Sequence, residues 1–200
     1  MNHDDLFRVV MLAMIAVFLP FALYHRLRSH TGERLDRWQE GVVILIGLRV
    51  SGLPCFIGCI AWMISPELVA WASVPLPIWI RCSGFVLLGF GGLLLVWTFR
   101  NLGKNLTDTV VTREDHSLVT TGPYRYVRHP FYLTFLVCIV GGSLVTANWF
   151  LLASGMVPFC FIVVRTRIEE QKLIDRFGDE YRDYIATTGR FLPKLKRQRE

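Results

Sequence analysis

Residues 131–164 read FYLTFLVCIVGGSLVTANWFLLASGMVPFCFIVV, and this apolar stretch decides the fold of the chain. A helix needs about 20 apolar residues to cross the roughly 30 Å of hydrocarbon in a bilayer, so the stretch is too long for a single crossing. Gly141-Gly142 and Ala147-Asn148 are typical of a tight reversal between helices. We therefore predict a helical hairpin of two short membrane spans.

Three further apolar runs precede this hairpin, at about residues 6–24, 42–64 and 78–99. The chain is 52% hydrophobic with a mean hydropathy of +0.40, above the usual range of soluble domains. Because a bilayer offers no water to the backbone, membrane spans are helices or closed barrels, and these runs lack the strict alternation of barrel strands. The sequence thus predicts an all-α, polytopic integral membrane protein with about five transmembrane helices.

Positive charge is distributed unevenly along the chain. The formal net charge is +6, and Lys and Arg gather in residues 25–37, 100–128 and 165–199, while residues 65–77 and 141–148 have almost none. The positive-inside rule then places the N-terminus outside and the C-terminus in the cytoplasm. A basic balance also suits anionic lipid headgroups, so we expect contact with membrane lipids and no nucleic-acid partner.

The region after the hairpin changes from apolar to amphipathic at Arg165. Helical spacing places Arg165, Glu169, Leu173 and Phe177 on one stripe, and Gly178 is expected to cap this helix. A short second helix is predicted to fold back through its face of Tyr181, Tyr184 and Ile185. The five cysteines all lie in apolar runs, which favours buried residues over a disulfide framework or a metal site.

Residues 116–132 read HSLVTTGPYRYVRHPFY and precede the hairpin directly. Proline is favoured in the first turn of a helix, so we predict that a helix starts at His129-Pro130 with its positive dipole end at the cytoplasmic boundary. Unpaired N–H groups there, with Arg125, Arg128 and His129, would suit an anion. The alternative is an interfacial belt of Tyr and Arg without a ligand.

Two arginines, Arg165 and Arg49, each allow two interpretations of their role. Arg165 and Glu169 are spaced as an ordinary ion pair on one helix, which need not mark a site. Arg49 lies about two turns inside the second span and either extends to the headgroups or faces a polar cavity.

Two blocks resemble the isoprenylcysteine carboxyl methyltransferase family and its phospholipid methyltransferase relatives: residues 122–132, and the Glu169-Glu170 pair followed by residues 177–181 and Tyr184. The resemblance covers roughly residues 100–193. It divides the chain into a three-span membrane region (1–99), a methyltransferase-like cofactor-binding region (100–193) and a basic tail (194–200). It implies S-adenosylmethionine in a cytoplasmic pocket closed by the C-terminal segment. The implied cofactor contacts are His116, Ser117, Leu118, Val119, Tyr124, His129, Pro130, Phe131, Tyr132 and Glu169.

By the same resemblance, Arg165 matches the position that holds the substrate and is our candidate catalytic residue. Glu169 would accept hydrogen bonds from the cofactor's amine or ribose, while His129 and the helix start would take its carboxylate. The expected function is a membrane-embedded methyltransferase that acts on a lipophilic or lipid-modified substrate, with a carboxylate as one candidate nucleophile. The alternatives are a sterol-reductase-like enzyme that uses NADPH, or a non-catalytic membrane protein that retains the pocket.

Overall fold

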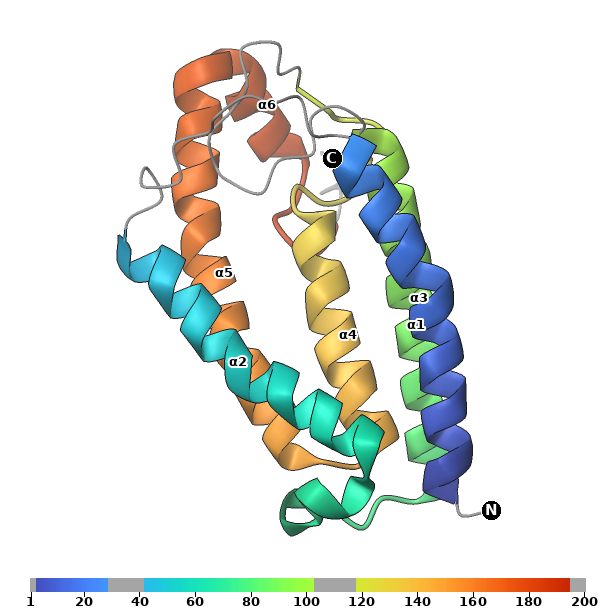
Figure 1. Ribbon diagram of the computed structural model, residues 1–200. Helices are drawn as coiled ribbons and strands as arrows, with labels where there is room; N and C mark the ends of the chain where they lie inside the picture. Colours follow the sequence, from blue (N-terminus) through green and yellow to red (C-terminus); the bar gives the residue numbers. More distant parts are fainter. Residues whose placement is uncertain (1–2, 29–41, 103–117, 195–200) are drawn as a thin grey trace, which may run out of the picture.

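The computed structural model describes residues 3–28, 42–102 and 118–194, and the regular elements in these ranges are all helices (Figure 1). They are α1 (His3–Arg28), α2 (Val42–Ile64), the 3-10 helix η2 (Pro66–Ala72), α3 (Ile78–Leu102), the 3-10 helix η4 (Gly122–Arg125), α4 (Pro130–Thr146), α5 (Trp149–Phe177) and α6 (Asp179–Thr187).

Four of these helices, α1, α2, α3 and α5, are long and apolar enough to cross a membrane, and α4 is a shorter apolar helix. The prediction of an all-α, multi-pass membrane protein is therefore confirmed, with the count of five spans only approximate. The second span matches α2 at both ends. The first and third predicted spans are a few residues shorter than α1 and α3, because polar residues at the helix ends continue the backbone hydrogen bonding.

The hairpin turns at Ala147-Asn148, as predicted. Ala147 adopts a left-handed conformation with φ 48°, and the Asn148 side chain accepts from the Leu151 N–H at 3.2 Å, which caps the start of α5. Gly141-Gly142 do not contribute to the reversal and lie inside α4. The second helix of the hairpin is also not short, because α5 runs without a break from Trp149 through the polar residues to Phe177.

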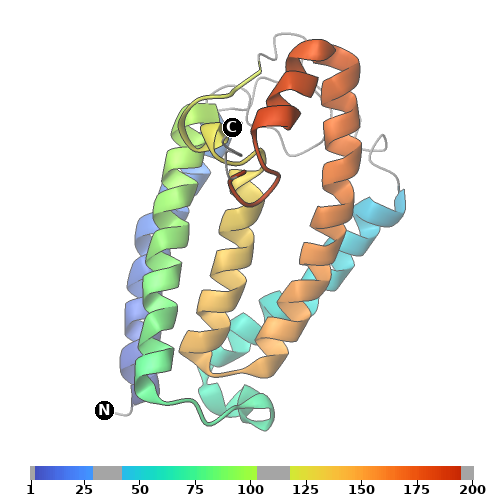
Figure 2. The ribbon, with the colours of Figure 1, turned by 180° about the vertical axis from the view of Figure 1, so that it is seen from behind.

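The four long helices and the shorter α4 form a bundle in which α4 is central. From behind, α3, α4 and α5 lie side by side, with α1 against α3 and α2 against α5 (Figure 2). The N-terminus, η2 and the α4–α5 turn lie at one end, and α6 lies at the other (Figure 1). The start of α4 and the polar half of α5 therefore meet at the end that carries α6.

Helices α3 and α4 approach each other through glycines. A Cβ atom on Gly84 would lie 2.6 Å from the Gly141 oxygen, and one on Gly141 would lie 2.9 Å from the Gly84 oxygen. Small residues let backbones approach closely in membranes, where no hydrophobic force drives helices together. This contact explains why Gly141 belongs to a helix and not to the turn.

Two arginines bind helix-end carbonyls at the end of the bundle where the N-terminus lies. Arg8 of α1 donates to the main-chain oxygens of Met63 (3.0 and 2.8 Å) and Ile64 (2.6 Å) at the end of α2. Arg81 of α3 donates to the Val145 oxygen at 3.0 Å, in the last turn of α4. The last carbonyls of a helix have no intrahelical partner, and exposing them to hydrocarbon is costly. These arginines therefore satisfy helix ends.

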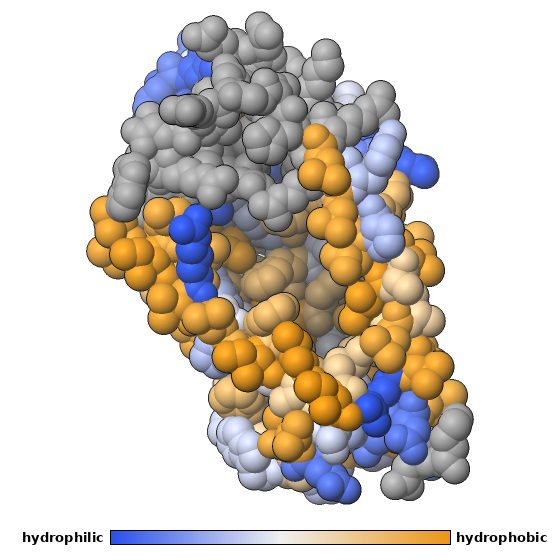
Figure 3. All heavy atoms as spheres, in the orientation of Figure 1, coloured by the Kyte–Doolittle hydropathy of each residue, from blue (hydrophilic) through white to orange (hydrophobic). Residues whose placement is uncertain are grey.

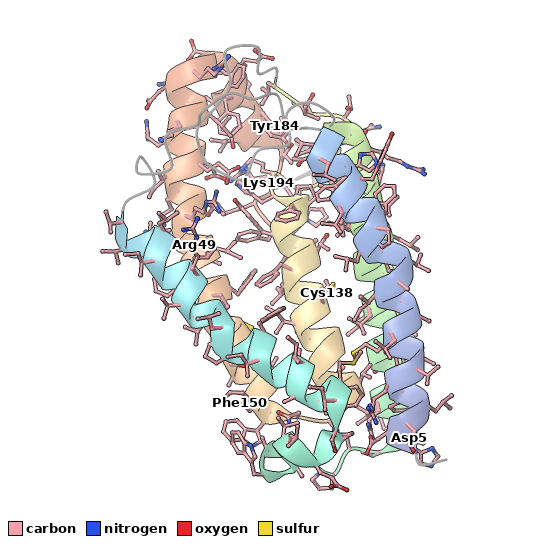
Figure 4. The ribbon with its side chains drawn as sticks, in the orientation of Figure 1. Asp5, Arg49, Cys138, Phe150, Tyr184 and Lys194 are labelled. Atoms are coloured by element: carbon pink, nitrogen blue, oxygen red, sulfur yellow. The ribbon has the colours of Figure 1, made fainter. Side chains whose placement is uncertain are left out.

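The outer surface of the described bundle is apolar along α1 and α2. Side chains such as Val17, Val43 and Phe56 are exposed, as expected for helices that face lipid. Figure 3 shows a hollow lined by apolar side chains between α2 and α1, which diverge toward the end that carries α6. Arg49 is exposed on α2, which fits extension to headgroups better than burial in a polar cavity (Figure 4).

Replacing Gly84 with alanine is expected to destabilise the bundle, because the new methyl group would collide with the backbone of α4. Overpacking of this kind costs about 1–3 kcal/mol. The matched control is Gly89→Ala in the same helix, whose Cβ would meet nothing within 4 Å. Thermal unfolding in detergent measures both variants. Equal unfolding temperatures for the two would contradict the close contact of α3 and α4.

Candidate functional site

The candidate site lies where α4 begins. Pro130 is the first residue of α4 and His129 its N-cap, which confirms the predicted helix start. The C-terminal strap, residues 188–194, lies against this point. Gly189 accepts from the Arg128 N–H at 2.8 Å, and Arg190 accepts from the His129 N–H at 3.1 Å. The main-chain N–H groups of Arg128 and His129, directly before the helix, are thus occupied by the strap.

The two sequence blocks meet at Glu169. The Tyr132 hydroxyl donates to Oε2 of Glu169 at 2.8 Å, and His129 Nδ1 lies 3.9 Å from the same oxygen. The rings of His129 and Tyr132 stack with centroids 5.4 Å apart. Burial, and then the charge of Glu169, raise the pKa of Tyr124, so its hydroxyl stays protonated beside the carboxylate. The structure therefore brings together Tyr124, His129, Tyr132 and Glu169.

The next residue, Glu170, is buried and holds three cationic or polar side chains. Its Oε1 accepts from Arg128 Nε at 2.9 Å and from Arg190 Nε at 3.1 Å, and it lies 3.1 Å from His129 Nε2. The Arg190 guanidinium also donates to Oε2. Neither Glu170 nor Arg190 is among the site residues predicted from the sequence. Their partners come from segments 20 to 42 residues away, so no local spacing could reveal them.

Helix α6 folds back over the site, as its predicted face indicates. Gly178, with φ 57°, ends α5 and donates its N–H to the Ile174 oxygen at 2.8 Å. The Tyr184 hydroxyl then donates to the main-chain oxygen of Tyr124 at 2.5 Å. Tyr181 is almost completely buried beside it. Both the predicted cap and the predicted second helix are confirmed.

Lys194 attaches the far end of the strap to α6. Its Nζ donates to the main-chain oxygens of Ile185 (2.7 Å) and Ala186 (3.0 Å), at the end of α6. Figure 4 shows Tyr184 and Lys194 at the same end of the bundle, opposite to Asp5 and Phe150. Residues 165–190 thus lie against the 122–132 segment and not apart from it.

The remaining predicted cofactor contacts are His116, Ser117, Leu118, Val119, Pro130 and Phe131. His116 and Ser117 lie outside the described residues, and Leu118 and Val119 are half-buried in an extended segment. The Phe131 ring stacks on Phe99 of α3 with centroids 5.8 Å apart, and Phe131 remains 41% exposed.

Arg165, the candidate catalytic residue, is half-buried on α5 one turn before Glu169. Helical spacing puts the two side chains on one face of α5. The role of Arg165 stays a prediction.

Comparisons with known proteins agree with the sequence-based resemblance. Residues 84–175 match the model of the isoprenylcysteine carboxyl methyltransferase (ICMT) family. Protein-S-isoprenylcysteine O-methyltransferase of Mus musculus is 29% identical over 142 residues, which cover 65% of this chain and 47% of that protein. Methanethiol S-methyltransferase 1 of Bradyrhizobium diazoefficiens is 33% identical over 138 residues, which cover 62% of this chain and 48% of that protein.

A solved structure is also similar. It is that of the eukaryotic intramembrane Ras methyltransferase ICMT, with a TM-score of 0.53 and 25% identity, covering 74% of this chain and 51% of that chain. The chain spans about half the length of the curated relatives it matches. The resemblance to the ICMT family is confirmed over the matched residues.

Replacing Glu170 with alanine is expected to destabilise the protein more than the same change at Glu169. Removal of Glu170 leaves the buried Arg128 guanidinium without its carboxylate, and loss of one partner of a buried ion pair costs about 3–5 kcal/mol. The Glu169 side chain is 28% exposed and its replacement removes the hydrogen bond from Tyr132, so it is the matched control. Thermal unfolding in detergent compares them. A larger loss for Glu169→Ala would refute the central place of Glu170.

Proposed function

We propose, from the ICMT family match of residues 84–175, that the protein is an S-adenosylmethionine-dependent methyltransferase embedded in the membrane. Its active site lies at the cytoplasmic boundary, and its acceptor is lipophilic. The observation that carries this proposal is the hydrogen bond from Tyr132 to Glu169, which joins the two family-like blocks in one site. The charge alternation along the chain supports the orientation, with the N-terminus outside.

The side chains present fit the chemistry of the cofactor. Glu169 is partly exposed, and its carboxylate can accept hydrogen bonds from an amine or from ribose hydroxyls. Tyr124 keeps its proton, so it offers a donor and an aromatic face at the same place. The positive end of the α4 dipole, at Pro130, suits a carboxylate. The predicted contacts at His116, Ser117, Leu118 and Val119 belong to this proposal on the strength of the resemblance.

The cofactor, when bound, supplies a methyl group on a sulfonium for in-line displacement. The protein contributes alignment and exclusion of water, since this chemistry depends mainly on the geometry of the reacting atoms. Helix α6 and the strap cover the site on the side away from lipid, with Tyr184 and Lys194 as their anchors. The acceptor must then arrive from another direction.

A lipophilic acceptor would reach the site from the bilayer. The hollow between α1 and α2 is lined by apolar side chains (Figure 3), and the two helices diverge toward the end that carries the site (Figure 1). Arg8 joins the two helices at the opposite end, so the opening lies nearer to Glu169. An embedded enzyme can in this way combine a water-soluble cofactor with an acceptor dissolved in lipid.

Two acceptor classes follow from the relatives. A carboxylate is ionised at neutral pH and needs no general base, only a cation such as Arg165 to orient it. This favours a prenylcysteine-like carboxylate as the first candidate. The second candidate is a thiol, because relatives named methanethiol S-methyltransferase match over a similar share of the chain. The NADPH reductase alternative is not favoured, since the relatives described above are methyltransferases.

Calorimetry of the detergent-purified chain with S-adenosylhomocysteine tests the cofactor. We expect binding, and we expect Glu169→Gln and Tyr132→Phe to weaken it by about tenfold, since hydrogen bonds to charged groups contribute roughly 1.5–3 kcal/mol. The control is Tyr126→Phe, because the Tyr126 side chain is exposed and packs near Trp97. Lack of binding refutes the cofactor, binding of NADPH instead supports a reductase, and unchanged binding in both site variants refutes the site.

The acceptor class is tested with Arg165→Gln and radiolabelled methyl transfer. If Arg165 orients a carboxylate, the variant raises the KM for N-acetyl-S-farnesylcysteine by about tenfold, the usual loss for a charge-assisted hydrogen bond. The KM for methanethiol, which has no carboxylate, stays unchanged. Equal effects on both acceptors would contradict a role in carboxylate recognition.

A further inference from the structure

Glu170 is buried between the guanidinium groups of Arg128 and Arg190, and both donate to its carboxylate. Two permanent positive charges at hydrogen-bond distance favour the ionised form of this carboxyl group. An ionised carboxylate has no proton to donate and can only accept.

This constraint determines which ring nitrogen of His129 carries the proton. Nε2 lies 3.1 Å from Oε1 of Glu170, so a hydrogen bond between them requires a proton on Nε2. In a neutral imidazole the other nitrogen, Nδ1, is then an acceptor. The ring has little freedom to turn, because it is 5% exposed and packs between Tyr132 and Phe191.

Nδ1 lies on the side of the ring where the proposed cofactor site is. It is 3.9 Å from Oε2 of Glu169, the oxygen that accepts from the Tyr132 hydroxyl. Two acceptors at this spacing are too far apart to be hydrogen-bonded to each other. A single ammonium group, with three N–H donors, can bridge them.

We propose that Glu170 is a positioning residue that keeps the His129 proton on Nε2, so that Nδ1 and Glu169 together accept from the cofactor's ammonium group. The inference rests on the proposed cofactor and replaces the expectation that His129 receives the cofactor's carboxylate. A neutral Nδ1 lone pair faces an amine favourably and a carboxylate unfavourably. Arg190 is a positioning residue as well, because it binds the strap to the same Glu170 carboxylate.

The tautomer is measured directly on the wild-type chain. Two-bond ¹⁵N–¹H correlation spectra of the imidazoles, recorded in detergent at the pH of the binding assay, identify the protonated nitrogen. His129→Gln assigns the His129 signals among the five histidines by their loss. We expect a neutral ring with its proton on Nε2. A proton on Nδ1, or on both nitrogens, overturns the proposal.

Binding supplies a second readout that a purely structural role would not change. Calorimetry compares S-adenosylhomocysteine with its analogue that lacks the amino group. We expect the wild type to prefer the amine-bearing ligand by about tenfold. Glu170→Gln, whose amide can pair with either tautomer, should reduce that preference at least threefold, a change that the exposed Glu180→Gln control should not cause.

The outcomes separate this proposal from the proposed function. If neither nucleoside binds to the wild type, the cofactor assignment fails and this inference fails with it. If both bind with equal affinity, or if Nδ1 carries a proton, the methyltransferase proposal stands and the role of Glu170 is refuted. If Glu170→Gln does not fold, two wild-type measurements still test the proposal: the His129 tautomer and the preference for the amine-bearing ligand.

Discussion

A single buried carboxylate, that of Glu170 on α5, is bonded to side chains from two other segments that are far apart in the sequence. Arg128 and His129 come from the start of α4, and Arg190 comes from the strap. Charges removed from water must be paired, so none of these groups can move without leaving another charged group buried and unpaired. The position of the strap, the start of α4 and the polar half of α5 therefore depend on one another, and the site exists only where all three meet.

The bilayer imposes the second constraint, because unpaired backbone groups are costly in hydrocarbon. Helices satisfy most of these groups, and the remaining helix ends need side chains. Arg8 and Arg81 supply them for α2 and α4, at the end expected to have little positive charge. Close packing of Gly84 against Gly141 then positions α4 on α3. The membrane-spanning helices thus determine the position at which α4 ends. The length of α4 then determines where its polar start reaches the membrane boundary.

Helix α5 connects these two environments. It begins at Trp149 beside the hairpin turn and continues to Phe177 without interruption, so one rigid element carries both lipid-facing residues and the two glutamates. Neighbouring positions on a helix point in different directions, and this separates the roles of the pair. Glu169 lies beside Tyr124 and Tyr132, where a ligand can reach it, while Glu170 is enclosed by cations. The proposed methyl transfer takes place beside the carboxylate of Glu169. The ion pairs of Glu170 hold the surroundings of Glu169 in place.

Much of this protein follows from its sequence alone. Run lengths predict the membrane helices, and the bounds of the second span agree with α2, because hydrocarbon thickness sets helix length directly. Pro130 and Gly178 mark a helix start and a helix end, since both act through local backbone geometry. The resemblance of two blocks also predicts that Tyr124, His129, Tyr132 and Glu169 belong to one site. Only the tertiary structure decided that Gly141 packs against a helix, that Arg8 and Arg81 cap helix ends, and that Glu170 and Arg190 support the site. These contacts join residues 20 to 64 positions apart, and such pairings depend on how helices pack, which no local pattern records.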